Sequence, residues 1–191
     1  MPSPAILCAL ALAAWLLLAA WADIRSRRIP NALVLAGIVC GLTLQVLAPQ
    51  GGGLFAFWWG GLGAVDALLG LLAGLALFMP LYLLRAVGAG DVKLLAMVGV
   101  WLGPKLIFGA ALLTLVAGGL LALLVMLATR SSRRILANVR FMLTTAMVGA
   151  SAGKFAPLDA PAASGVRLPY ALAITAGTLA QLVWLLARSG P

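Results

Sequence analysis

Residues 5–31 read AILCALALAAWLLLAAWADIRSRRIPN, an apolar run that ends in an aspartate and a cluster of arginines. A transmembrane helix needs about 20 apolar residues, and the run from Ala5 to Ala22 approaches that length. It lacks the basic start of a signal peptide and is followed by arginines rather than by a cleavage site. We therefore interpret this stretch as a permanent first membrane helix.

The rest of the chain has the same apolar character. Of its 191 residues, 64% are hydrophobic and only 9% are charged, whereas about 25% are charged in a soluble domain. Residues 92–129 must hold two crossings, for which Gly103-Pro104 and Gly109 are the available breaks. We predict an all-α polytopic protein with about six transmembrane helices, forming a single membrane-embedded domain over 1–191. The apolar runs lie at about 5–22, 32–48, 61–84, 93–108, 110–128 and 169–187.

The distribution of basic residues predicts the orientation. With the N-terminus outside, only Lys105 and Arg188 of the 13 basic residues fall on the outer side. Cytoplasmic loops carry the excess of Lys and Arg, so this bias favours an outside N-terminus. It also accounts for the net charge of +9 without a nucleic-acid partner. The inner residues are Arg25, Arg27, Arg28, Arg85, Lys93, Arg130, Arg133, Arg134, Arg140, Lys154 and Arg167.

The longest segment between predicted spans is the cytoplasmic loop 130–168. Its first half opens with arginines and continues with apolar residues at helical spacing as far as Met147. That pattern is typical of an amphipathic helix on the membrane surface. A plain membrane anchor is the favoured role, and gripping or gating of a substrate is the alternative. Glycine, alanine, serine and proline dominate from Gly149 to Pro169, which indicates a loop.

The absence of whole residue types limits the possible chemistry. The chain has no histidine and no glutamate, which excludes Ser-His triads, Cys-His dyads and histidine zinc sites. Cys8 and Cys40 both lie inside apolar runs and do not suggest a metal site. We expect no metal and no cofactor, and aspartate is the leading candidate for proton transfer. The four acidic residues are Asp23, Asp66, Asp91 and Asp159.

Two of these aspartates lie in unusual local sequences. Asp23 ends the first span and is followed by arginines and then by Pro30-Asn31, a pair that favours a helix start. Asp91 follows Gly88-Ala89-Gly90 at the start of another span, where glycines permit positive φ and close approach of a neighbouring segment. Taken singly, each position has a structural explanation that is as good as a functional one. Asp23 is then an interfacial aspartate paired with an arginine, and Asp91 is a simple N-cap residue.

The two aspartates are more informative as a pair, because both fall on the predicted inner face. Two carboxylates in one site cannot both ionise easily, so one keeps a proton near neutral pH. One carboxylate then activates water, and the other acid protonates the amide leaving group. This predicts a metal-free peptidase with Asp23 and Asp91 as the catalytic residues. A Ser–Lys pair is a weak rival, because Lys93 and Lys105 have no serine close in sequence.

The chain resembles the type IV prepilin peptidases, membrane aspartic proteases of the Gly-x-Gly-Asp class, and in particular their short six-helix form from tight-adherence pilus systems. The resemblance extends over about 5–187 and implies removal of a short basic leader just after a glycine, at the cytoplasmic boundary of the pilin helix. Gly88, Gly90 and Lys93, which flank Asp91, are candidate substrate-binding residues. The motifs that carry the resemblance are Asp23 to Asn31, Gly88 to Leu94, and Arg167-Leu168-Pro169-Tyr170.

The resemblance also implies partners and a location. These are a prepilin or pseudopilin substrate, the lipid bilayer and other pilus assembly proteins, in a bacterial inner membrane with the active site facing the cytoplasm. Long members carry a cysteine-rich zinc-binding insert and methylate the new N-terminus. This chain lacks the insert and any recognisable nucleotide pocket, so we do not expect methyl transfer. Ala171 stands where the family often has glycine after the tyrosine.

Two other functions remain open. A transporter or assembly scaffold would use its aspartates to bind protons or cations, and it would place them near the bilayer midplane or in paired broken helices. A related Gly-x-Gly-Asp protease, presenilin-like or archaeal preflagellin-like, would act on a different substrate. For the remaining acids we expect a structural or interfacial role for Asp66, near an outer helix end, and a solvated turn position for Asp159.

Overall fold

The computed structural model describes residues 3–56, 59–84, 86–128 and 169–188, and the structural statements below refer to these ranges. They form helices and loops, with no β-strand beyond two isolated bridges among residues 50–61. The all-α prediction is therefore confirmed for the described part of the chain. The predicted surface helix and loop 130–168 lie outside it. The helices are α1 (Pro4–Ser26), α2 (Asn31–Leu47), α3 (Gly63–Leu83), α4 (Ala89–Ala128) and α6 (Tyr170–Arg188).

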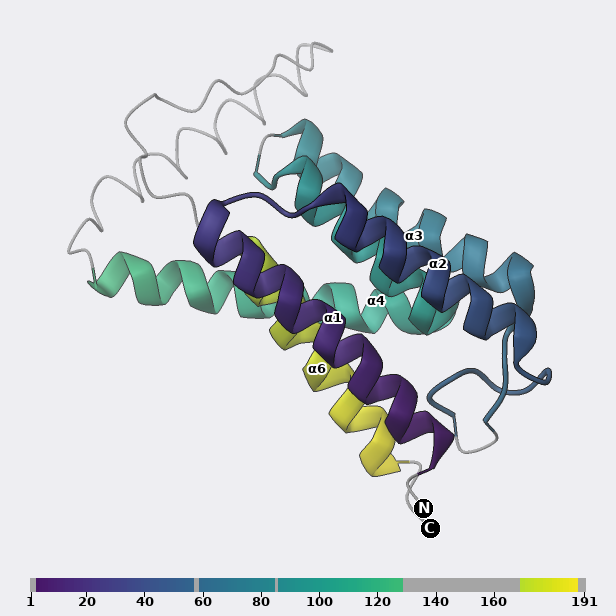
Figure 1. The fold of residues 1–191 in the computed structure, drawn as a ribbon. Coiled ribbons are helices and arrows are strands. Elements are labelled where there is room, and N and C mark those ends of the chain that lie inside the picture. The colour runs from purple at the N-terminus through teal and green to yellow at the C-terminus, as the bar shows by residue number, and fades with distance from the viewer. Residues whose placement is uncertain (1–2, 57–58, 85, 129–168, 189–191) are drawn as a thin grey trace, which may run out of the picture.

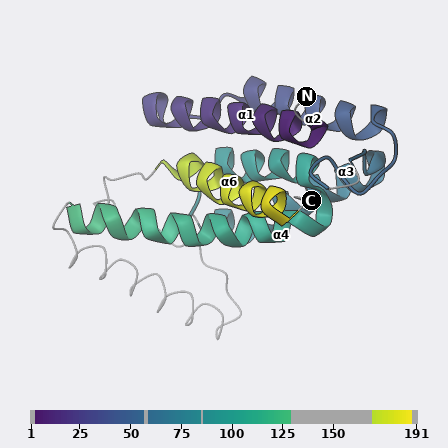
Figure 2. The same cartoon turned by 90° about the horizontal axis from the view of Figure 1, so that it is seen from below.

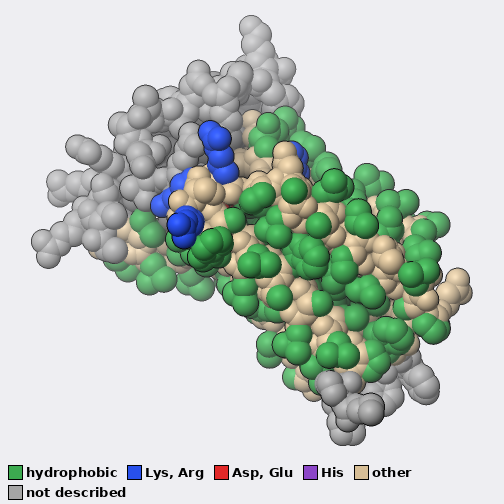
Figure 3. Space-filling model, viewed as in Figure 1, with side chains coloured by type: hydrophobic (Ala, Val, Ile, Leu, Met, Phe, Trp, Pro, Cys, Tyr) green, Lys and Arg blue, Asp and Glu red, His purple; other side chains and the backbone are tan. Residues whose placement is uncertain are grey.

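Four of these helices, α1, α3, α4 and α6, are long and apolar enough to cross a membrane, and α2 is apolar but shorter. Many of their leucines and valines are exposed. Figure 3 shows hydrophobic side chains over most of one face, with lysines and arginines gathered at one end. An apolar exterior of this kind is suited to lipid, so the chain is a membrane protein. The count of six spans stays a prediction.

α2 and α3 pack against the first part of α4, whereas the contacts of α6 at Gly109, Thr114 and Gly118 lie after Gly103. α3 packs along α4, and α2 lies against both, while α6 packs against α4 and α1 (Figures 1 and 2). The α4 residues from Leu94 to Gly103 are all buried as a result. α1 and α6 lie side by side and run in opposite directions (Figure 1). The start of α4, where Asp91 lies, is therefore attached to the most buried segment of the fold.

Glycines let α3 and α4 approach each other closely. A Cβ added at Gly70 would overlap the carbonyl oxygen of Gly99, and a Cβ added at Gly99 would overlap that of Gly70. One turn further along α3, a Cβ at Gly74 would lie 2.6 Å from the carbonyl oxygen of Leu95. Small residues four apart are a common means of bringing membrane helices into backbone contact. This contact fixes α4 firmly against α3.

α4 changes direction at Gly103, whose φ of 77° and ψ of 175° are not helical (Figure 1). The predicted break at Gly103-Pro104 is therefore present, whereas Gly109 lies inside the helix, where it faces Gln181. Only glycine adopts this backbone conformation without strain. Because Pro104 has no N–H, the carbonyl of Val100 loses its usual helical donor.

Gln45 of α2 supplies the missing hydrogen bonds at this bend. Its side chain is 1% exposed, and its Nε2 donates to the carbonyl oxygens of Val100, at 3.2 Å, and Trp101, at 2.9 Å. Its Oε1 accepts a hydrogen bond of 2.8 Å from the backbone N–H of Leu62, just before α3. One side chain thus satisfies polar backbone groups from two elements in an apolar interior, where unpaired groups are costly.

We expect Gln45→Leu to destabilise the fold by about 2 kcal/mol, because leucine has a similar volume but removes the donor to the Val100 carbonyl, which Pro104 cannot replace, and the acceptor of the Leu62 N–H. Thermal unfolding in detergent measures the change. Thr43→Val is the matched control on the same helix, since the Thr43 hydroxyl only donates to Val39 one turn earlier. Equal melting temperatures for the two variants would contradict the role given to Gln45.

Candidate functional site

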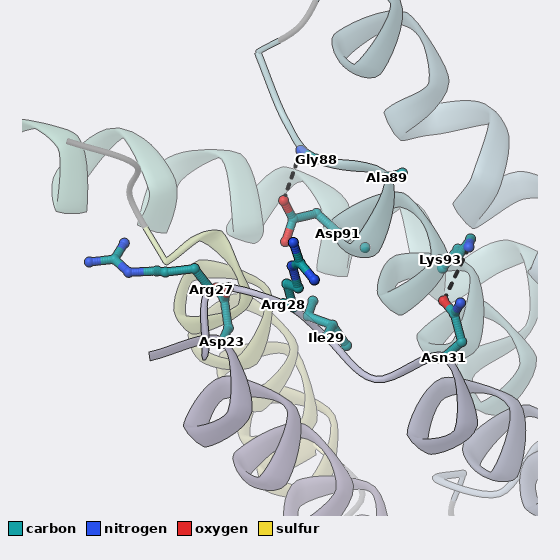
Figure 4. Close-up of a pocket in the computed structure, with 10 residues that line it drawn as sticks. Asp23, Arg27, Arg28, Ile29, Asn31, Gly88, Ala89, Asp91 and Lys93 are labelled. Carbon is teal, nitrogen blue, oxygen red and sulfur yellow. Dashed lines mark hydrogen bonds between the residues drawn. The ribbon is translucent and has the colours of Figure 1, made fainter. Parts of the chain in front are cut away.

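The predicted site residues gather around an open pocket of about 350 Å³ at one end of the helices (Figure 4). The pocket brings together the end of α1, the loop that follows it and the start of α4. Asp66 is not among its lining residues and lies in the first turn of α3. Asp159 lies outside the described residues. The lining residues are Asp23, Arg27, Arg28, Ile29, Asn31, Gly88, Ala89, Gly90, Asp91 and Lys93.

Asp23 lies in the last turn of α1 and is 8% exposed. The helix ends after Ser26 because Arg27 takes a left-handed conformation (φ 53°) and donates its N–H to the carbonyl of Asp23 at 2.8 Å. The Asp23 carboxylate accepts a hydrogen bond of 3.3 Å at Oδ2 from the backbone N–H of Ala171, in the first turn of α6. N–H groups in a first turn lack intrahelical partners and favour a carboxylate.

Asp91 is the third residue of α4 and completes the cap of its own helix. Gly88 is the N-cap residue, since its carbonyl accepts the N–H groups of Asp91 and Val92 at 3.1 and 3.3 Å. In turn, Oδ2 of the Asp91 carboxylate accepts a hydrogen bond of 3.0 Å from the N–H of Gly88 (Figure 4). This is the side chain-to-backbone half of a capping box. Asp91 is therefore held by its own glycine motif.

The two glycines of that motif differ in how closely their neighbours approach them. The expectation of positive φ is wrong here, because neither Gly88 nor Gly90 is among the positive-φ residues of the described chain, and α4 already begins at Ala89. A Cβ at Gly90 would lie 3.4 Å from the side chain of Ile29, and a Cβ at Gly88 would lie 3.3 Å from Oδ2 of Asp91. The contact at Gly88 is tighter than most Cβ contacts, whereas the one at Gly90 is an ordinary van der Waals contact, so close approach accounts for Gly88 alone.

Lys93 connects the starts of two helices. Its ammonium group donates to the side-chain oxygen of Asn31 at 3.2 Å, in an exposed contact (Figure 4). Asn31 is the first residue of α2 and follows Pro30, as the Pro-Asn pair predicts. This contact helps to hold the loop between α1 and α2 beside the start of α4. A substrate-binding role for Lys93, Gly88 and Gly90 stays a prediction.

Three basic residues line the pocket together with the two aspartates: Arg27, Arg28 and Lys93. In Figure 4 the Arg28 side chain extends toward the Asp91 carboxylate, whereas the Arg27 side chain points away from it. Positive charge around a partly enclosed pocket attracts negative charge, including the partial charge of a polarised carbonyl oxygen. The pocket thus combines groups for proton transfer with groups that stabilise an anion.

The contact that sequence reasoning missed is the one between Asp23 and Ala171. Pro169 and Tyr170 begin the predicted span 169–187, but the sequence does not tell which neighbour the first turn of that helix faces. The available signal was Pro169 itself, because proline just before a helical run marks a first turn whose N–H groups need partners. Nothing in the sequence connects that turn to Asp23.

Comparison with known proteins agrees with this geometry. The family model of the type IV leader peptidase family matches residues 10–123. No curated protein and no solved structure matches the chain. The matched segment contains both pocket aspartates, the glycine motif and the buried part of α4. Since it also covers more than half of the sequence, the chain belongs to the type IV leader peptidase family.

Proposed function

We propose that this protein is an aspartic endopeptidase that removes the short basic leader of type IV prepilin-like substrates, with Asp23 and Asp91 as its catalytic pair. Membership of a leader peptidase family makes it a peptidase in general terms. The observation that favours the two-aspartate mechanism is that Asp23 and Asp91, far apart in sequence, line the same pocket. No other pair of acidic side chains in the described chain lines it.

The hydrogen bonding of the two carboxylates suits shared acid and base roles. Each has one oxygen, Oδ2, fixed by a backbone N–H at a helix start. Among the described residues neither Oδ1 accepts a hydrogen bond, which leaves it available for water or the substrate. In the proposed reaction one carboxylate takes a proton from water, and the water oxygen bonds to the scissile carbonyl carbon. The other carboxylic acid gives its proton to the leaving nitrogen as the C–N bond breaks.

The position of the pocket suits cleavage at the edge of a membrane helix. The part of α4 before Gly103 has 14 residues and is roughly 21 Å long, which is shorter than the ~30 Å apolar core of a bilayer. With Gly103 near one surface, Asp91 would lie roughly 18 Å from that surface, in the half of the apolar core that is nearer the opposite one. A peptide bond at the end of a substrate helix reaches that depth when the helix end unwinds.

We place the pocket on the cytoplasmic side of a bacterial inner membrane, with the N-terminus outside and six spans. The support for this orientation is that four of the six described basic residues, Arg25, Arg27, Arg28 and Lys93, lie at or beside the pocket. Cytoplasmic ends of membrane helices carry such excess positive charge. Other pilus assembly proteins are the partners expected on this side.

The orientation predicts the result of cysteine labelling. In a variant with Cys8 and Cys40 replaced by alanine, a membrane-impermeant thiol reagent added to intact cells should label Gly52→Cys, which is exposed in the loop before α3. It should not label Ser26→Cys, which is exposed at the pocket end of α1, until the cells are opened. The reverse pattern would overturn the orientation and the cytoplasmic site with it.

A cleavage assay tests the proposed function directly. The purified protein, in detergent or vesicles, is incubated with a prepilin-like substrate that has a basic leader, a glycine and an apolar helix. Chelator is present throughout, because the sequence offers too few ligands for a stable zinc site. The expected product begins with the residue after the glycine. A transporter or scaffold would release no product, and a protease of another specificity would cut only a different membrane substrate.

A further inference from the structure

The start of α6 contacts helices on both sides of the candidate site. The ring of Tyr170 packs edge-on against Phe78 of α3, with a centroid distance of 6.0 Å and an interplanar angle of 62°. Phe78 is 1% exposed, so this contact lies in the core. The same ring lies on Gly118 of α4, where an added Cβ would be 2.7 Å from Oη and 2.8 Å from Cε2. Tyr170 therefore fixes the start of α6 against both α3 and α4.

The next residues of α6 bind α1. Ala171, which is fully buried, donates its N–H to Oδ2 of Asp23. One turn further on, the hydroxyl of Thr175 shares its proton between the carbonyl oxygen of Ala171, at 2.8 Å, and that of Leu16 in α1, at 3.1 Å. The first two turns of α6 thus hold α1 at two points, and one of these points is a pocket carboxylate.

α6 is the principal helix that links the two aspartates. α1 packs against α6 and α2 and has no substantial direct contact with α4, whereas α6 packs extensively on α4. Asp23 belongs to α1 and Asp91 to α4. The distance between their carboxylates therefore depends on where α6 lies, together with the loop that places Ile29 against Gly90.

We propose that Tyr170 and Ala171 are the positioning residues of the aspartate pair. The Tyr170 ring sets the place of α6 on α3 and α4, and the N–H of Ala171 holds the Asp23 carboxylate at the distance from Asp91 that shared proton transfer requires. This inference rests on the proposed peptidase function. It assigns no chemistry to the Tyr170 hydroxyl, which has no hydrogen-bond partner among the described residues.

Two adjacent glycines of α4 provide a matched test. A Cβ at Gly118 would push the Tyr170 ring aside, whereas a Cβ at Gly119 would meet nothing within 4 Å. Both changes to alanine favour the helix equally, and neither residue lines the pocket. Because misplacing a reacting group by about 1 Å costs about 100-fold in rate, Gly118→Ala should lower kcat by at least about 10-fold with KM unchanged. Gly119→Ala should retain the wild-type kcat and melting temperature.

A conservative substitution distinguishes the role of the Tyr170 ring from that of its hydroxyl. Tyr170→Phe keeps the contact with Phe78 and should retain most of the wild-type kcat. Equal kcat values for Gly118→Ala and Gly119→Ala would overturn the positioning role. So would an inactive Tyr170→Phe variant of unchanged melting temperature, because the hydroxyl would then take part in the chemistry.

Hydrogen exchange gives a readout that needs no activity and applies if Gly118→Ala does not fold. The N–H of Ala171 lies in a first turn and relies on Asp23 as its acceptor, so Asp23→Ala should speed its exchange at least about 10-fold. Asp91→Ala should leave it unchanged. Equal protection of this amide in wild type and Asp23→Ala would overturn the inference. A wild-type protein that cuts no leader would instead refute the proposed function, whatever the exchange result.

Discussion

Asp91→Asn and Asp23→Asn are each expected to lower the rate of leader cleavage by about 10³-fold or more. Asparagine keeps the size of the side chain and an oxygen that accepts the N–H of Gly88 or Ala171. The helix caps and the pocket shape should therefore survive. What is lost is the proton that each carboxyl group exchanges, and general acid or base catalysis alone contributes about 10²–10⁴-fold.

The double variant distinguishes a working pair from two independent contributions. If one aspartate takes a proton from water while the other gives one to the leaving nitrogen, loss of either stops the same step. Groups that act as a unit are strongly non-additive, so Asp23→Asn with Asp91→Asn should be little slower than either single change. A double variant slower by the product of the two single effects would argue against shared chemistry.

Asp66→Asn is the control for this experiment. Asp66 lies in the first turn of α3, away from the pocket, where its charge favours the helix start. We expect a loss of about 0.3–1 kcal/mol of stability and a turnover close to wild type at matched protein levels. Substantial turnover by Asp91→Asn, or a folded but inactive Asp66→Asn, would show that the catalytic pair has been misassigned.

The sequence was most informative where a feature depends on a few neighbouring residues. The helix start at Asn31 and the bend at Gly103 follow from proline and glycine chemistry, and both are present. Asp23 ends one predicted span and Asp91 begins another, and both lie on the predicted inner face of the membrane. This topology predicts that the two residues converge. The pocket contains both residues. The outside N-terminus and the surface helix within 130–168 stay predictions.

Contacts between helices that are distant in sequence could not be predicted from such local patterns. The hydrogen bond of Ala171 to Asp23 involves a backbone group, and every helix start has such groups. Gln45 was one polar residue in an apolar run, and its role depends on the bend of another helix. In both cases a local rule identifies the group that needs a partner, but only the packing of the helices identifies the partner.

The spacing of glycines in α3 and α4 is an intermediate case. Gly70 and Gly74, like Gly99 and Gly103, are four residues apart, a spacing typical of close helix contacts in membranes. That spacing indicates a packing face without indicating which helix covers it. The structure pairs the two faces, with Gly70 and Gly99 opposite each other.

Gly99→Ala is expected to cause the largest loss of stability, about 3 kcal/mol, at the upper end of the range for overpacked interiors. The added Cβ would overlap the backbone carbonyl of Gly70, and a backbone group cannot move aside by changing rotamer. α3 and α4 must separate or slide, which also disturbs Asp91 two turns earlier on α4. We therefore expect a lower melting temperature in detergent together with a reduced rate of cleavage.

Gly119→Ala is the matched control, because it adds the same methyl group to the same helix where nothing lies within 4 Å. Gly70→Ala should resemble Gly99→Ala, since the two added methyl groups disturb one contact from opposite sides. For the same reason the double variant should lose less stability than the sum of the two single losses, as expected for residues that share a contact. If Gly99→Ala melted at the same temperature as Gly119→Ala, the backbone contact between α3 and α4 would not be what holds the start of α4 in place.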